Sequence, residues 1–384
     1  MPGQETADAR APVSFIPSDS PERGPEDGIA LCLSGGGYRA MLFHLGALWR
    51  INELGLLPHL ARISSVSAGS IVAGLLGLKW QALRFDAAGV GAAFDAEVVA
   101  PVRALASRTI DLPAILLGML LPGGASARIA AAYRRYVFGR ATVQALPDSP
   151  RFVINATDLQ SGVLWRFMKP YSRDYRVGEI PHSTVELARA VAASSAFPPF
   201  LSPARFPFRE GDYTKGSGED LQYAPYTTHV LLTDGGVYDN LGLETAWKRF
   251  RTVLVSDAAG RVQPKERLGG NWISQSIRVE ELIHAQVGSL RKRQLIASYR
   301  TSERQGAYWG IGSDISNFAL ADALPCPLDQ TTELAKIPTR LKQLDAAVQE
   351  RLIDWGYGIC DAALRKHFNP ALPKTSRFPF QRGV

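Results

Sequence analysis

The 384-residue chain has the composition of a globular protein, with 46% hydrophobic residues, 21% charged residues and a net charge of +7. This profile excludes collagen-like, low-complexity and wholly disordered chains, and the length allows a large buried core. Three scattered cysteines are too few for a disulfide framework or a zinc cluster, which favours a reducing compartment. The sequence also lacks a D-x-D-x-D-G calcium loop, so we expect neither a cofactor nor a metal.

The first 26 residues are rich in Pro, Glu, Asp and Arg, and they predict a flexible leader. They lack the apolar stretch of about 7–15 residues that a signal peptide needs. The most apolar run, residues 112–121, is about half as long as the roughly 20 residues that span a bilayer. We therefore expect a cytoplasmic protein without a transmembrane segment.

The first regular unit is a strand, a glycine-rich turn and a helix. Residues 28–33 form a short apolar run that is typical of a buried parallel strand. From Ala40 the apolar residues recur at helical spacing, and Gly55 ends the pattern.

A second unit of the same kind follows directly. Residues 62–66 are short and β-prone, Ser67 lies at the turn, and residues 68–80 are helical and rich in small side chains. Two consecutive strand–turn–helix units predict a parallel sheet with helices packed on it.

The rest of the chain predicts a helical addition and then further strands. Residues 81–145 are expected to be almost entirely helical, as a cap or side layer, and the loop 209–226 is a candidate lid. Pro338 is predicted to begin a last amphipathic helix. No composition shift marks a linker, so we expect one α/β domain over 27–370 and a tail over 371–384. The further strands are predicted at 152–156, 163–168, 229–233 and 252–256.

The positive charge is concentrated in one segment, residues 245–304. It contains twelve Lys or Arg against five Asp or Glu, so its excess of seven equals the net charge of the whole chain. Such a segment indicates an anionic partner, either nucleic acid or a lipid surface, or else a solvated basic face.

The first chemical motif is SGGGYR, in which Gly35, Gly36 and Gly37 lie between the strand and the helix. Glycines allow a close backbone approach, and a helix start offers free N–H groups to a phosphate or to an oxyanion. The spacing fits neither of the common nucleotide-binding motifs. A tight turn without a ligand is the alternative.

The second motif, SVSAG, is a variant of the nucleophile elbow G-x-S-x-G centred on Ser67. Ser65 stands where the elbow usually has its first glycine, and it is small enough for the sharp turn. Ser64 and Ser70 are competing hydroxyls, but only Ser67 has both the β-prone run before it and Ala-Gly after it. A serine-rich helix cap is the alternative interpretation.

A serine nucleophile needs a base, and the histidines give no clear candidate. His44 falls on the apolar face of its helix and predicts a core role, which leaves His284 or His182 for a conventional triad. Asp234 directly follows an apolar strand and precedes two glycines, as expected at a site built on strand ends. The competing strand-end carboxylates, which lack the glycine pair, are Asp158 and Asp257.

The glycine turn, the elbow and the late Asp-Gly-Gly occur in an order that resembles the patatin-like phospholipases. The glycine loop is also similar to that of the cytosolic phospholipase A2 group, and residues 156–159 and 192–200 match further family segments. The resemblance covers about residues 27–257. It implies a three-layer α/β fold with a mainly parallel central sheet flanked by helices, an added helical cap and C-terminal helices.

The resemblance also implies the chemistry. Ser67 would be the nucleophile, Asp234 its base without a histidine, and Gly35, Gly36 and Gly37 the donors of the oxyanion hole. Arg39 would anchor the loop or meet a substrate phosphate. The expected activity is that of a phospholipase A or lysophospholipase, which cleaves fatty-acyl esters through an acyl-enzyme.

The implied partner is a phospholipid or lysophospholipid, with transient peripheral contact at a membrane surface and no nucleic acid. The run 112–121 and the helix 129–138, with Arg128, Arg134 and Arg135, would form a rim or an interfacial anchor, unless they pack in the core. The competing functions are a Ser-His-Asp esterase and a non-catalytic membrane- or nucleic-acid-binding module that uses residues 245–304.

Overall fold

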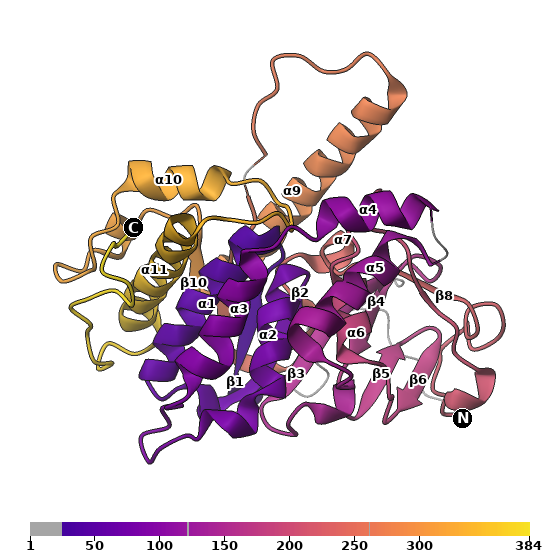
Figure 1. The fold of residues 1–384 in the computed structure, drawn as a ribbon. Helices are drawn as coiled ribbons and strands as arrows, with labels where there is room; N and C mark the ends of the chain where they lie inside the picture. The colour runs from indigo at the N-terminus through magenta and orange to yellow at the C-terminus, as the bar shows by residue number, and fades with distance from the viewer. Residues whose placement is uncertain (1–24, 121–122, 261) are drawn as a thin grey trace, which may run out of the picture.

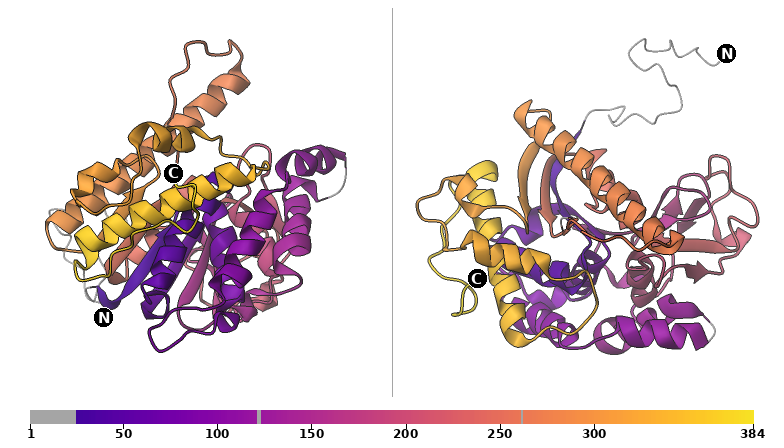
Figure 2. Two further views of the ribbon diagram at one scale, coloured as in Figure 1. Left: turned by 60° about the vertical axis from the view of Figure 1, so that its left-hand side comes forward. Right: turned by 90° about the horizontal axis from the view of Figure 1, so that it is seen from above.

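The computed structural model describes residues 25–120, 123–260 and 262–384 (Figure 1). The predicted leader lies outside the described residues except for its last two positions, and Glu26 already belongs to the first strand. A central sheet lies between two helical layers, which confirms the predicted three-layer α/β fold (Figures 1 and 2).

Five parallel strands form the centre of the sheet, in the order β10–β9–β1–β2–β3. Their interiors are buried on both faces, which explains the continuous apolar runs in the sequence. We call the edge at which these strands end the carboxyl edge. The strands are β1 (Glu26–Leu33), β2 (Leu60–Val66), β3 (Arg151–Asp158), β9 (Phe250–Asp257) and β10 (Gln305–Gly310).

An antiparallel extension continues the sheet beyond β3, and the sequence did not predict it as such. Its strands have three to five residues with mixed polarity, so the alternating pattern is too short to stand out. β4, β5 and β6 follow one another from β3, while β8 pairs with both β3 and β7. The strands are β4 (Leu164–Phe167), β5 (Tyr171–Asp174), β6 (Gly178–Pro181), β7 (Ala204–Phe206) and β8 (Val230–Asp234).

Side chains of β1 alternate between two hydrophobic clusters, one on each face of the sheet. Leu31 and Leu33 pack in the larger cluster with α1 (Gly37–Glu53), α2 (Ala68–Leu78) and α11 (Ala346–Ala363). Ala30 and Cys32 pack in the smaller cluster with α8 (Glu244–Trp247) and the end of α9 (Trp272–Arg300). All three cysteines are free and buried.

The segment predicted to be helical, residues 81–145, contains most of the added helices, although residues 84–91 form a loop. Ile129 and Phe138 are buried in the core, and the role of the surrounding helix at a membrane stays a prediction. The α-helices not yet given are α3 (Ala100–Ala106), α4 (Asp111–Leu120), α5 (Gly124–Tyr133), α6 (Leu187–Ser194), α7 (Gly236–Asp239) and α10 (Leu328–Lys336). The short 3₁₀ and π turns are η1 (Leu57–His59), η2 (Trp80–Leu83), η3 (Asp95–Val99), η4 (Arg134–Phe138), η5 (Val143–Ala145), η6 (Glu210–Asp212), η7 (Ile315–Phe318) and η8 (Leu364–Phe368).

The last amphipathic helix does not begin at Pro338 as predicted, but eight residues later, at Ala346. Asp345 caps it by accepting a hydrogen bond from the Val348 N–H, at 2.9 Å. The preceding backbone cannot be helical because it bonds to other parts of the fold. We call residues 337–341 the strap, because they cross from α10 past the glycine turn.

Two other predicted segments are well packed. The loop 209–226 bonds to the β5–β6 hairpin, with the Thr214 N–H donating to Glu179 O at 2.8 Å. Its role as a lid remains a prediction. The tail 371–384 lies against the helical layer, where the Phe380 ring meets Trp49 edge-on at 5.9 Å.

α9 departs most from the rest of the fold. Its C-terminal end packs against the face of the sheet opposite α1 and α2. Its N-terminal part projects beyond the body of the protein (Figures 1 and 2). Among the helices of the described residues, none has both the length and the apolar character required for a bilayer crossing.

Candidate active site

Ser67 lies in the sharp turn between β2 and α2, with φ 53° and ψ −121°. This backbone conformation is strained for a residue with a side chain, and it is typical of a functional turn. Ser67 is partly exposed, whereas Ser64, Ser65 and Ser70 are fully buried. The accessible hydroxyl at the elbow is therefore that of Ser67.

The turn forms although Ser65 replaces the usual glycine. The Ser65 hydroxyl donates to Val153 O at 3.2 Å and accepts from Ser70 Oγ at 3.0 Å, so it is satisfied inside the fold. On the other side of the turn, a Cβ at Gly69 would lie only 2.6 Å from Leu33 O. Position 69 is therefore glycine because α2 touches β1 there, whereas position 65 can be serine because its hydroxyl has hydrogen-bond partners.

The register of β3 brings Asp234 beside Ser67. Val66 at the end of β2 pairs with Asn155, and Asp234 at the end of β8 pairs with the next residue, Ala156. At Ala156, one side of β3 is already paired with β4. β8 therefore pairs with the opposite side of β3, directly beyond the point where β2 ends. The serine and the carboxylate therefore meet although 167 positions separate them in the sequence.

The Asp234 carboxylate is buried and only sparsely hydrogen-bonded. It accepts from the Gly236 N–H at 2.7 Å and from the Ser67 hydroxyl. Burial raises the pKa of Asp234 to about 7, although these two hydrogen bonds oppose the shift. A carboxylate with this pKa is a stronger base than an exposed one, as proton abstraction from a hydroxyl requires.

The glycine turn leaves only some of its N–H groups free. The Gly35 N–H donates to Asn240 O at 3.1 Å, and the Tyr38 N–H donates to Arg340 O at 2.9 Å. The Gly36 and Gly37 N–H groups have no such partner among the described residues. These two N–H groups are therefore available to an added acceptor, whereas the Gly35 N–H is already hydrogen-bonded to Asn240 O.

The strap explains why position 37 is glycine. Gly37 has φ +66°, and a Cβ there would lie 2.6 Å from both the N and the O atom of Arg340. Asp111 in turn holds Arg340, accepting from its Nε at 2.5 Å and from the Leu341 N–H at 3.0 Å. The first residue of α4 thus fixes the strap, and the strap closes against the glycine turn.

Arg39 is hydrogen-bonded to the same strap. Its guanidinium is buried and donates to Ile337 O, to Ala258 O at 3.1 Å and to Thr339 Oγ1 at 3.2 Å. Burial lowers the pKa of Arg39 to about 10, and the nearby Asp257 opposes the shift. With its bonds directed at protein oxygens, Arg39 joins three segments and is not presented to a ligand.

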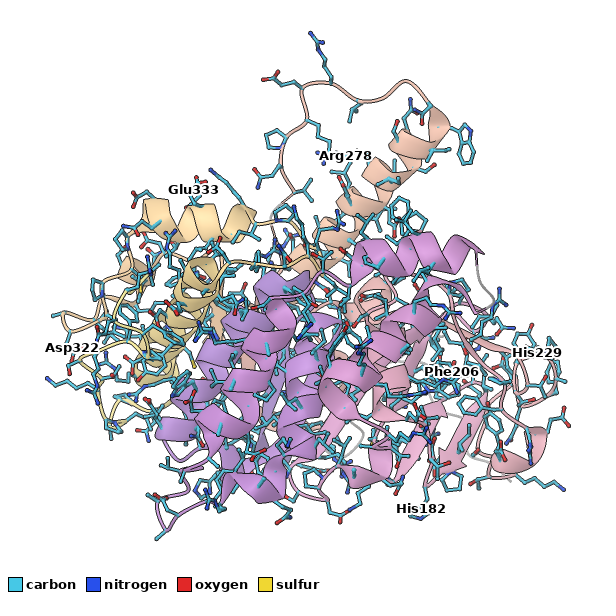
Figure 3. All side chains as sticks on the ribbon, viewed as in Figure 1. His182, Phe206, His229, Arg278, Asp322 and Glu333 are labelled. Atoms are coloured by element: carbon cyan, nitrogen blue, oxygen red, sulfur yellow. The ribbon has the colours of Figure 1, made fainter. Side chains whose placement is uncertain are left out.

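Among the described residues, no histidine side chain is hydrogen-bonded to Ser67 or Asp234. His44 is buried below the glycine turn, with Nδ1 2.8 Å from Ser256 Oγ and Nε2 2.9 Å from Ser34 O, which confirms its predicted core role. Burial lowers its pKa to about 4, so it is neutral. His182 and His229 lie at the periphery of the molecule (Figure 3). His284 on α9 lies beside the Phe197 ring, at a centroid distance of 6.2 Å.

The two other strand-end carboxylates have different surroundings. Asp257 accepts from Lys292 Nζ at 3.0 Å and from the Tyr308 hydroxyl at 2.8 Å, so it is fully paired. Asp158 binds its own turn through the Gln160 N–H at 2.8 Å, and burial raises its pKa to about 6. Neither carboxylate is hydrogen-bonded to Ser67 among the described residues.

Several residues that support the site were missed in the sequence. Ser194 Oγ accepts the Ser67 N–H at 2.9 Å, and Asn240 O accepts the Gly35 N–H. Ser194 lies in the small-residue segment 192–200, which was the only available signal, and no local pattern marks Asn240 or the strap. Among the described residues, no cluster of three or more His, Cys, Asp or Glu side chains could hold a metal ion.

Comparison with solved structures gives remote similarities. Human GIVD cytosolic phospholipase A2 has 11% identity and a TM-score of 0.42, over 62% of this chain and 49% of that chain. Its complex with methyl gamma-linolenyl fluorophosphonate has 11% identity and a TM-score of 0.48, over 88% and 57%. VipD from Legionella pneumophila has 15% identity and a TM-score of 0.30, over 80% and 66%. This chain thus spans about half to two thirds of the length of these proteins.

Comparison with curated proteins found no match. The family model described as patatin-like phospholipase matches residues 31–247, more than half of the chain. The matched range includes the glycine turn, Ser67 and Asp234, while the strap, α9 and α11 lie outside it. The chain belongs to the patatin-like phospholipase family.

Proposed function

We propose that the protein is a serine lipid acyl hydrolase of the phospholipase A or lysophospholipase type. The observation that carries this proposal is the hydrogen bond between the Ser67 hydroxyl and a buried carboxylate, Asp234, whose pKa is about 7. The free N–H groups of Gly36 and Gly37 support it, because acyl transfer requires donors for the developing oxyanion.

In the proposed first half-reaction, Ser67 Oγ attacks the ester carbonyl carbon while its proton passes to Asp234. The oxyanion accepts hydrogen bonds from the glycine turn. The tetrahedral intermediate then collapses, the C–O bond to the alcohol breaks, and Asp234 protonates the leaving oxygen. An acyl-enzyme on Ser67 and a free lysolipid or alcohol remain.

In the second half-reaction, a water molecule gives its proton to Asp234 and attacks the acyl carbonyl. Collapse of the second tetrahedral intermediate releases the fatty acid, and Ser67 Oγ recovers the proton from Asp234. One carboxylate thus alternates between base and acid, and its pKa near 7 suits both roles at neutral pH.

Family membership supports fatty-acyl esters of membrane lipids as the substrates, with transient contact at a membrane surface. The test is mass spectrometry of the products formed from a mixed lipid extract, comparing wild type with Ser67→Ala. We expect fatty acids and lysolipids from the wild type only. Equal product release by the Ser67→Ala protein would refute the proposal.

The competing triad is tested with His284→Ala and His182→Ala. We expect both variants to keep the wild-type turnover of a soluble ester, because neither side chain bonds to Ser67 or Asp234. A loss of 100-fold or more in kcat in one of them would favour the histidine mechanism.

The geometry of segment 245–304 does not favour a nucleic-acid module. Arg291 donates to Glu244 at 3.1 Å and Lys292 to Asp257 at 3.0 Å, so part of the positive excess neutralises acids of the body. Arg249 and Arg251 pair with Glu26 and Asp27. The basic surface that is free to bind a partner is therefore smaller than the number of Lys and Arg residues in this segment suggests.

A further inference from the structure

The projecting part of α9, residues 272–290, carries its apolar side chains on the outside. Trp272 is 74% exposed, Val279 53%, Ile283 55% and Leu290 51%. The charged neighbour Arg278 has only 15% of its side chain exposed and pairs with Glu281 at 2.9 Å. This polarity is the reverse of that expected for a helix surrounded by water.

These four residues form one stripe along the helix, and Ile273 and Leu282, which are also about half exposed, lie beside it. In the stripe, the spacing of seven, four and seven residues brings the four side chains to the same side, because the helix repeats every 3.6 residues. α4 adds Leu112 and Leu116, each about half exposed. Large exposed apolar surfaces of this kind mark interaction sites in folded proteins.

The exposed apolar residues of α9 and α4 lie near the side from which a substrate would reach Ser67. His284 of α9 is beside Phe197, and Phe197 follows Ala196, whose carbonyl accepts the Asp234 N–H at 3.0 Å. On the other side, the first residue of α4 holds the strap that closes against the glycine turn. Figure 2 shows α9 crossing over the carboxyl edge in the view from above.

We infer that the outer face of α9, together with α4, is the surface on which the protein docks to a lipid layer. The inference rests on the proposed function and specifies where the enzyme meets its substrate. Val279, Ile283 and Leu290 insert between the lipid head groups, and Trp272 lies at the boundary, where indole rings are favoured. The opening to Ser67 then faces the lipid layer.

The charge of the projecting part indicates how it docks. Residues 272–290 contain one Arg and two Glu, so this part has a net charge of −1. Insertion is therefore driven by apolar contact, and it does not require anionic lipids. This refines the expectation that the positive excess selects the partner, because the excess lies elsewhere in segment 245–304.

A second copy of the chain fits the surface less well than a lipid layer does. The exposed apolar residues belong to three separate elements, α4, α9 and the turn at Phe197. A protein partner seated there would also cover the approach to Ser67. A lipid layer in the same place supplies the substrate.

The test uses the full-length protein and flotation with phosphatidylcholine vesicles, comparing wild type with Val279→Asp/Ile283→Asp. The matched control, Gln81→Asp/Ala82→Asp, adds the same two charges at exposed positions beyond the C-terminal end of α2. We expect at least tenfold weaker vesicle binding by the α9 variant and wild-type binding by the control. Raising the salt to about 1 M should leave wild-type binding nearly unchanged, because such salt screens charges beyond about 3 Å.

A second variant, Trp272→Ala, removes an exposed ring without adding charge, and it should weaken vesicle binding several-fold. Both α9 variants should hydrolyse a soluble short-chain ester at the wild-type rate, and the Ser67→Ala protein should still bind vesicles. The latter two results separate docking from catalysis, so a failure of the proposed function would leave the binding result intact. Wild-type binding by Val279→Asp/Ile283→Asp, binding to anionic vesicles alone, or a wild-type dimer that this variant dissociates would overturn the inference.

Discussion

Ser67 combines a strained backbone with an accessible hydroxyl, and the strain can be measured. At φ 53° and ψ −121°, glycine is the residue that fits without cost. We predict that Ser67→Gly raises the free energy of unfolding by about 1 kcal/mol relative to Ser67→Ala, since both lose the hydroxyl and only glycine relieves the strain. Chemical denaturation of the two variants checks this, and equal stability would mean that the turn is not strained.

Asp234 is predicted to lower stability while it supports activity. Its folded pKa is raised to about 7 by burial, so folding is opposed wherever the unfolded chain is ionised. Stability associated with this group is fully present below its unfolded pKa of about 4 and is lost as the pH rises through about 7. We predict that Asp234→Asn is more stable than the wild type at pH 8, by a few kcal/mol in order of magnitude.

This gain should shrink toward zero as the pH falls to about 4, where both states of the wild type are protonated. Thermal melts of both proteins across this pH range provide the measurement. Activity should follow the opposite course, with kcat/KM rising to a plateau above about pH 7 as Asp234 loses its proton. A gain in stability that is equal at pH 4 and pH 8 would contradict the buried-carboxylate interpretation.

At the residue scale, the sequence is informative wherever one position carries a strong local signal. Ser67 stands in an elbow pattern and Asp234 stands between a strand and two glycines, so both could be selected in advance. Ser194 and Asn240 contact the site through long-range hydrogen bonds, and no local sequence pattern predicts which partners they meet. The sequence could not show that the Gly35 N–H, unlike those of Gly36 and Gly37, is already hydrogen-bonded, because its acceptor, Asn240 O, lies about 200 positions away.

At the element scale, the strap is the least expected part of the site. It lies outside the region that matches the family model, yet its backbone accepts the Tyr38 N–H and closes against Gly37. Asp111 holds it through two hydrogen bonds, from Arg340 Nε and from the Leu341 N–H, while the Leu112 N–H in its own helix also donates to the Asp111 carboxylate at 2.7 Å. We therefore regard Asp111 and Arg340 as positioning residues.

We predict that Asp111→Ala lowers kcat for a soluble ester about tenfold with little change in KM, because the glycine donors act mainly on the transition state. The unfolding free energy should fall by about 1–3 kcal/mol, because the buried Leu341 N–H loses its acceptor. Asp111→Asn keeps an acceptor for the Leu341 N–H and should recover part of kcat. Steady-state kinetics of both variants, with Ser67 labelling as a second readout, measure this. An unchanged kcat in Asp111→Ala would show that the strap does not position the donors.

The elements themselves were predictable to different degrees. α1 follows from its helical periodicity, β1 and β2 follow from short apolar or β-prone runs, and α2 follows from the small-residue segment after Ser67. The start of α11 was predicted wrongly because Pro338 is a good first residue for a helix, while the strap backbone bonds elsewhere. The extent of α9 was missed because several of its apolar residues face outward, while Arg291 and Lys292 pair with acids of the body.

At the scale of the whole molecule, the parallel centre of the sheet was predictable and the antiparallel extension was not. The two early units fix the direction of the first strands, but nothing in the sequence of β8 states that it takes over the edge of β3 left by β2. That exchange of partners creates the site. Net charge alone did not predict the binding surface either, because some of the Lys and Arg residues in segment 245–304 form salt bridges with acids of the body.

The central claim is that Ser67, activated by Asp234, is the acyl-forming nucleophile. Its most direct test is the mass of the Ser67 peptide after reaction with a fluorophosphonate, in wild type and in Asp234→Asn at pH 8. We predict one adduct, on Ser67, which forms at least 100-fold more slowly in Asp234→Asn. An adduct on another residue, or an equal labelling rate in the two proteins, would contradict the claim.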